Sequence, residues 1–126
     1  MERILVIDDD KFVRDSLALT LEWAGYAVAE AANAREGLAF HRENPASVVI
    51  ADNLNADEEA WEDLRALRCH SPALPIISIS GTVPSTDQES DRLRHILGVV
   101  YCLQKPFTVD ELLSTIQMAL PSLARS

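Results

Sequence analysis

Short apolar runs alternate with amphipathic segments along this 126-residue chain, and the alternation limits the possible folds more than any other feature. Five runs, most of them rich in β-branched residues, have the character of strands covered on both faces. They are RILVI, the weaker YAVAEA, SVVIAD, LPIISIS and GVVYCLQKP. A stretch with apolar residues at helical spacing follows each run, the first of them over residues 11–24. The chain is therefore expected to form five consecutive βα units.

Local signals mark where several of the helices begin and end. Asn33 with Glu36, and Thr108 with Glu111, have the spacing of capping boxes. Gly25 is typical of a residue that stops a helix. Repeated βα units predict an α/β fold with a five-stranded parallel sheet in the flavodoxin-like order 2-1-3-4-5. A closed barrel would need eight such units, so residues 1–126 are expected to form a single open-sheet domain.

Composition excludes several classes of partner. A net charge of −9 argues against direct binding to nucleic acid or to an anionic membrane, and no segment approaches the length of a membrane span. Cys69 and Cys102 have no disulfide or metal-site spacing, which fits a reducing cytoplasm. The scattered His41, His70 and His95 are expected to be solvated.

Polar residues gather where the predicted strands end. Asp8 and Asp9 follow the first strand, Asp52 ends the third, Ser80 ends the fourth, and Lys105 follows the fifth. The second strand, at the outer edge, ends in alanines. Because parallel strands end at one edge of the sheet and ligands bind where the strand order reverses, these five side chains should converge on a crevice.

The residues at this edge favour phosphoryl chemistry. Adjacent carboxylates suit Mg²⁺, which prefers oxygen ligands and retains several waters. Lys105 would add a positive charge for a phosphoryl oxygen, and Ser80 a hydrogen-bond donor. No histidine or cysteine lies at the predicted edge, and a carboxylate can accept a phosphoryl group without a base. The sequence thus predicts an aspartyl phosphate formed with Mg²⁺.

With these residues placed, the chain resembles the response-regulator receiver domains of two-component signalling, such as the chemotaxis regulators. The resemblance covers nearly the whole chain and depends on VIDDD, VVIAD, IISIS and LQKPF in the family's order. It implies a phosphoacceptor, a Mg²⁺ site, a switch hydroxyl, a lysine that pairs with the phosphoryl group, and a cis peptide. Asp52 would be the phosphoacceptor. Asp8, Asp9, Asp52 and the backbone carbonyl of Leu54 would form the Mg²⁺ site. Ser80 would be the switch hydroxyl, Lys105 would pair with the phosphoryl group, and the cis peptide would precede Pro106.

The resemblance also implies the partners and the role of the domain. A histidine kinase or a histidine phosphotransfer protein would donate the phosphoryl group, docking beside the crevice near the first helix. Phosphorylation would then switch the face formed by the fourth helix, fifth strand and fifth helix, which can also mediate a homodimer. The switched face would act on a downstream protein or on a fused output domain. Such a domain is a signalling module, and assists only its own phosphorylation and dephosphorylation.

The chain departs from the family pattern in ways that affect output. Asn55–Ala56 and Ala60 stand where a Met-Pro pair and a glycine are usual. Cys102 replaces the usual switching Tyr or Phe and is expected to be a small buried residue, while the adjacent Tyr101 should point to the opposite face. We therefore expect atypical output coupling, and a phosphorylation-independent interaction module remains an alternative.

Two further expectations concern the loops. Leu54 and Thr82 occupy the variable positions that tune dephosphorylation in this family, and an apolar Leu54 cannot orient water, so a long-lived phosphoryl group is expected. Asp10, Lys11 and Arg14 are expected to be a solvated helix start.

A haloacid-dehalogenase-type phosphatase, with Asp8 and Asp10 as its D-x-D motif, is a second alternative. That family needs a further acidic pair at the site after its lysine. Here only Asp110 and Glu111 follow Lys105, and Glu111 belongs to a predicted capping box.

Overall fold

The computed structural model, which describes residues 2–52, 58–80 and 99–120, has a five-stranded parallel sheet. The strand order is β2-β1-β3-β4-β5, so the predicted α/β flavodoxin-like fold is confirmed. The strands are β1 Arg3–Ile7, β2 Ala27–Ala31, β3 Val48–Asp52, β4 Ile76–Ser80 and β5 Val99–Gln104. The helices are α1 Lys11–Trp23, α2 Ala34–Glu43, α3 Glu58–His70 and α5 Val109–Ala119. The helix expected near Leu93 lies outside the described residues.

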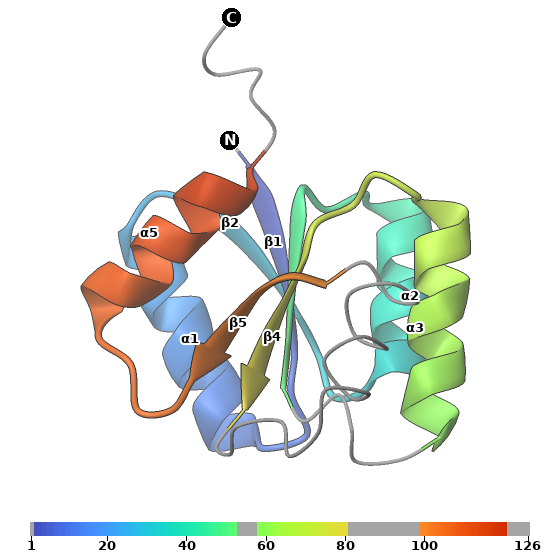
Figure 1. Cartoon of the computed structure of the whole chain (residues 1–126), viewed down its shortest axis with the longest axis horizontal. Coiled ribbons are helices and arrows are strands. Elements are labelled where there is room, and N and C mark those ends of the chain that lie inside the picture. Colours follow the sequence, from blue (N-terminus) through green and yellow to red (C-terminus); the bar gives the residue numbers. More distant parts are fainter. Residues whose placement is uncertain (1, 53–57, 81–98, 121–126) are drawn as a thin grey trace, which may run out of the picture.

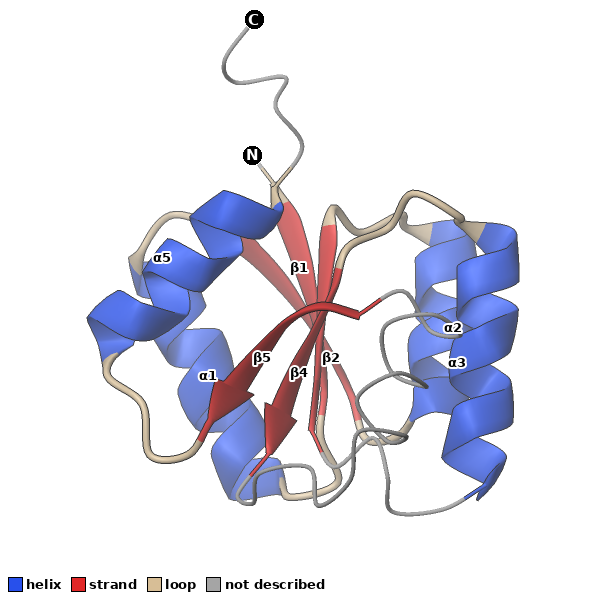
Figure 2. Cartoon of the chain, viewed as in Figure 1, coloured by secondary structure: helices blue, strands red, loops and turns tan. Residues whose placement is uncertain are grey.

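Helices cover both faces of the sheet (Figure 1). Helices α1 and α5 pack on one face, and α2 and α3 pack on the other (Figure 2). The sheet twists between these two layers, and its strands run from the edge near the end of α5 toward the opposite edge, at the bottom of the view in Figure 1. That opposite edge is where the predicted site residues are expected.

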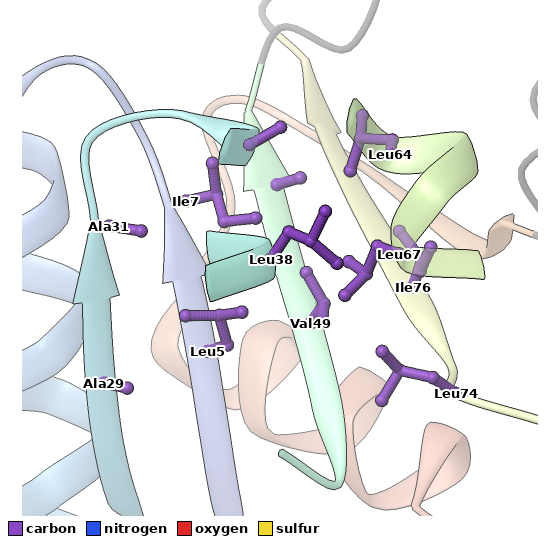
Figure 3. Close-up of a cluster of buried hydrophobic side chains, with 12 residues drawn as sticks. Leu5, Ile7, Ala29, Ala31, Leu38, Val49, Leu64, Leu67, Leu74 and Ile76 are labelled. Carbon is purple, nitrogen blue, oxygen red and sulfur yellow. The ribbon is translucent and has the colours of Figure 1, made fainter. Parts of the chain in front are cut away.

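Two separate apolar cores result from this arrangement. On the face of α2 and α3, Leu38, Leu64 and Leu67 point at Val49 and Ile76 of the sheet (Figure 3). Leu64 and Leu67 are at most 1% exposed, as their helical spacing predicts, whereas the side chain of Trp61 lies outside the described part. The other core joins α1 and α5 to the opposite side of the same strands, through residues that include Leu21, Ile50, Ile77, Leu112 and Ile116.

The predicted helix boundaries are confirmed where the structure describes them. Thr108 and Glu111 form a capping box at the start of α5. The Asn33 side chain accepts a hydrogen bond from the Glu36 backbone N–H at the start of α2. Gly25, with φ of 102°, follows α1 in a backbone conformation that residues with a side chain rarely adopt. Sequence-local rules thus fixed these boundaries correctly.

The predictions about the exposure of His41 and Cys102 were wrong. His41 is 2% exposed, because it lies on the same face of α2 as Ala34 and Leu38 and packs against the layer of α3. Cys102 is exposed, because β5 is an edge strand and Cys102 points away from the core to which Tyr101 contributes. The opposite orientations of Tyr101 and Cys102 agree with the predicted alternation. Within the described residues, no helix combines the length and apolar character needed to cross a membrane.

Candidate functional site

The strand register brings the predicted site residues to one edge of the sheet. Ile7 pairs with Ala51, so Asp8 and Asp52 end adjacent strands at the same level. Asp52 pairs with Ile79, and Ser80 pairs with Gln104, which immediately precedes Lys105. These ends lie on the lower edge of the sheet in Figure 1. The predicted convergence is therefore present in the backbone.

Asp8 is the most constrained of these residues. Its backbone N–H donates to the Ala31 carbonyl at 3.1 Å, which extends the pairing of β1 with β2 by one residue. Its Oδ1 accepts from the Asp10 backbone N–H at 2.9 Å. The residue is only 2% exposed, and a carboxylate that is so far removed from water requires compensating interactions or a bound cation.

The three consecutive aspartates have different environments. Asp9 is exposed at the sheet edge, beside the buried Asp8. Asp10 belongs to the helix, because its Oδ1 accepts from the backbone N–H of Phe12 at 2.9 Å and caps α1. The helix-start interpretation of Asp10 is confirmed, and its carboxylate is engaged in capping.

The donor set fits a hard divalent cation. The carboxylates of Asp8 and Asp9 are oxygen donors at the end of β1, and Asp52 ends the neighbouring strand. Among the described residues, no group of three or more His, Cys, Asp or Glu side chains could hold a metal. Asp8 and Asp9 supply two carboxylates, and Asp52 would supply the third. The side chains of Asp52 and Ser80, and the whole of Leu54, lie outside the described part of the chain.

Lys105 stands at the end of the edge strand β5, on the far side of β3 and β4 from β1. It is partly buried and follows β5, and the Lys105–Pro106 peptide is cis, as the resemblance implied. Beside it, a largely apolar groove of about 490 Å³ runs between α1 and the segment leading into α5. Phe12, Val13, Lys105 and Phe107 are among its lining residues, and Phe12 is 84% exposed.

Arg14 is a residue whose contribution the sequence analysis missed. Its expected solvation is wrong, because the side chain is 16% exposed and its Nη1 donates to the Asp8 carbonyl at 2.8 Å. The signal was present in the sequence: Arg14 stands at helical spacing with Leu17 and Leu21, which are buried. Lys11, by contrast, is solvated as predicted and pairs with Asp15.

Comparison with known proteins agrees with this geometry. The family model of the response regulator receiver domain matches residues 4–117. Response regulator MprA of Mycolicibacterium vanbaalenii is 34% identical over 119 residues, which cover 94% of this chain and 50% of that protein. The chain therefore spans about half the length of the curated relatives that it matches.

Solved structures show the same similarity. Chemotaxis protein CheY4 of Vibrio cholerae superposes with a TM-score of 0.83 at 31% identity, covering 95% of this chain and 99% of that one. A CheY-like receiver domain protein of Methanospirillum hungatei gives 0.80 at 30% identity, covering 94% and 92%. This chain belongs to the response regulator receiver domain family, whose members are signalling domains of two-component systems.

Proposed function

We propose that this receiver domain is the phosphoacceptor of a His-Asp phosphorelay and that Asp52 receives the phosphoryl group in a Mg²⁺-dependent reaction. The observation that carries the proposal is the meeting of Asp8, Asp9, Asp52 and Lys105 at one edge of the sheet. Asp52 ends a buried strand and has two other carboxylates and a lysine at the same sheet edge. This setting supports a role in phosphoryl transfer better than a role in packing.

The transfer requires no general base. A carboxylate oxygen of Asp52 attacks the phosphorus of a donor phosphohistidine, and the P–N bond breaks as the new P–O bond forms. The electron pair of the broken bond stays on the donor's imidazole nitrogen. Mg²⁺, when bound, supplies charge neutralisation at the phosphoryl oxygens. Asp8, Asp9, Asp52 and the Leu54 carbonyl would hold this ion.

Two other groups would complete the site. The Lys105 ammonium would pair with a phosphoryl oxygen, and the Ser80 hydroxyl would donate a hydrogen bond to another. Ser80 ends β4, which is next to β3, and Lys105 follows β5, one strand further along the sheet. Their formation of new bonds on phosphorylation is the step by which the domain would report its state.

The phosphoryl donor would dock beside the crevice. A histidine kinase or a histidine phosphotransfer protein must bring its phosphohistidine to the sheet edge, and the groove between α1 and Lys105 lies next to that edge. The exposed ring of Phe12 adds apolar surface there, which suits a protein partner. The domain itself would act only on its own acyl phosphate.

Output would pass to a downstream protein or to a fused domain. Relatives about twice as long as this chain are consistent with a fused output domain. The switching face, which would also serve a homodimer, includes β5 and α5, and here β5 presents the exposed Cys102 in place of an aromatic switch. We expect its coupling to Asp52 to be atypical for that reason.

Intact-mass spectrometry after incubation with acetyl phosphate and MgCl₂ tests the proposal. The wild-type chain should gain the mass of one phosphoryl group, and Asp52→Asn or excess EDTA should abolish the gain. No gain by the wild type would support a phosphorylation-independent interaction module. A gain that survives Asp52→Asn but is lost in Asp8→Asn would support the phosphatase-like alternative.

A further inference from the structure

We propose that Arg14 is a positioning residue for the metal site, holding the main chain at Asp8 so that the Asp8 and Asp9 carboxylates are arranged before a cation binds. The proposal concerns the Mg²⁺ site of the proposed function and rests on it. It assigns to the first turn of α1 the task of orienting the metal ligands, which the carboxylates do not perform themselves.

Arg14 contacts the acidic segment through its backbone. Nη1 donates to the carbonyl oxygen of Asp8 at 2.8 Å, six residues back along the chain. Asp8 is then fixed at three points, since its N–H donates to Ala31 and its Oδ1 accepts from the Asp10 N–H. The bond to Arg14 fixes the Asp8–Asp9 peptide, and the orientation of this peptide determines where the exposed Asp9 carboxylate lies.

A second, looser contact joins the guanidinium to the neighbouring strand. Nε of Arg14 lies 3.4 Å from Oε1 of Glu30, which is on the adjacent strand β2. Glu30 also has Asp15 as an acidic neighbour; burial first, and then this neighbour, raise the pKa of Glu30. The Lys11 ammonium lowers the pKa of Asp15 and forms a 2.7 Å ion pair with it. Arg14 thus spans from α1 to β2 and to the end of β1, and only 16% of its side chain is exposed.

This geometry distinguishes positioning from simple electrostatics. A positive charge close to a cation site opposes cation binding, so loss of charge alone should strengthen the binding of Mg²⁺. Loss of a contact that orients the ligands should weaken it, as removal of outer-shell partners does at other metal sites. The two effects have opposite signs, and a single measured affinity can separate them.

Isothermal titration calorimetry of the unphosphorylated domain with MgCl₂ provides that measurement. Arg14→Met should raise the Kd for Mg²⁺ about tenfold, and Arg14→Lys, which keeps the charge but loses the planar fork, should weaken binding in the same direction. Lys11→Met is the matched control, because it removes a charge from the same helical turn without a contact to Asp8. Its Kd should stay unchanged or fall. Circular dichroism melting confirms that each variant is folded at the titration temperature.

Glu30→Gln tests the second contact from another strand. It should weaken Mg²⁺ binding less than Arg14→Met, and should add nothing in the Arg14→Met background, since both act through one guanidinium. A purely structural role would lower the melting temperature of the Arg14 variants and leave the Kd unchanged, which would overturn the proposal. Equal tightening in Arg14→Met and Lys11→Met would also overturn it.

The outcomes separate this inference from the proposed function. A wild-type domain that binds Mg²⁺ but gains no phosphoryl group would refute the proposed function, and the Kd series would still decide the role of Arg14. A domain that is phosphorylated normally, with the same Kd in all Arg14 variants, would refute the inference alone. Absence of Mg²⁺ binding by the wild type would refute both.

Discussion

His41 and Ser71 are joined by a hydrogen bond of 2.7 Å between Nε2 and Oγ, which links α2 to the turn that follows α3. Nδ1 of the same ring accepts the backbone N–H of Ala46 at 2.9 Å. Nε2 therefore carries the proton and donates it to Ser71, so the pattern requires a neutral ring. Both nitrogens of a buried imidazole are thus used to hold the loops on the side of α2 and α3.

Stability should consequently depend on the charge of His41. Burial, and to a lesser extent the nearby His70, lower the pKa of His41 below its ordinary 6.5. The unfolded chain binds the proton more readily, so the stabilisation is complete above about pH 6.5 and is lost as the pH falls toward the lower folded-state pKa. Urea unfolding between pH 8 and 5 should show the free energy of unfolding declining over that interval. His41→Gln should flatten the decline, whereas the exposed His70→Gln should largely retain it.

Truncation of the same ring gives a second measure of its role. His41→Ala leaves the Ala46 N–H without its acceptor, and a loss of about 1–3 kcal/mol in unfolding free energy is expected at pH 8. An unchanged denaturation midpoint would contradict the role assigned to this hydrogen-bonded pair.

Gly37 marks a close approach of α2 to β1. A Cβ at this position would lie 2.7 Å from Cδ1 of Ile7, so Gly37→Ala should destabilise the domain despite the better helix propensity of alanine, by about 1 kcal/mol net. Ile7→Val removes the Cδ1 atom. In that background only the tight contact with Cγ1, at 3.1 Å, remains, so Gly37→Ala should cost clearly less, which chemical denaturation of the four variants would reveal. Equal effects in both backgrounds would disprove the steric explanation.

The separation of Asp10 from its neighbours also has measurable consequences. Asp10→Ala removes the cap of α1 and should cost about 1 kcal/mol of stability, while Asp10→Ser should retain most of it. Neither change should prevent phosphorylation by acetyl phosphate. Asp9→Asn should instead weaken Mg²⁺ binding, so that phosphorylation requires a higher Mg²⁺ concentration, with little loss of stability. A chain that loses phosphorylation on Asp10→Ser would show that Asp10 serves the site directly.

The lifetime of the phosphoryl group remains a prediction from the sequence. Leu54 and Thr82 lie outside the described residues, but an apolar side chain at position 54 offers no group to orient a hydrolytic water. Leu54→Asn should therefore shorten the half-life of the acyl phosphate, measured by intact mass after removal of the phosphodonor. A wild-type half-life of only seconds in Mg²⁺ buffer would contradict this view.

The sequence predicted the elements whose causes are local. The capping of α5 by Thr108 and Glu111, the stop at Gly25 and the strand order all follow from nearby residues and from general rules of connection. The positions of Asp8 and Asp52 at neighbouring strand ends follow from the same rules. These features need no knowledge of how side chains pack.

Arg14 and His41 were misjudged because their burial depends on contacts between elements. Each lies at helical spacing with buried apolar residues, Leu17 and Leu21 for the arginine and Leu38 for the histidine. A polar residue in such a row is buried only when another element supplies partners, here the Asp8 carbonyl and Ser71. The prediction weighed the polar character of these residues above their position in the row, because neither partner belongs to the same helix.

The sheet divides the interior into two cores that share strands but not side chains. Leu21 beneath α1 and Leu38 beneath α2 thus face different layers, and the free-energy costs of Leu21→Ala and Leu38→Ala should simply add. Core substitutions on the face of α1 and α5 can therefore accumulate independently of the other core over evolutionary time. Such changes would require no compensating substitutions in the layer that the His41–Ser71 pair holds together.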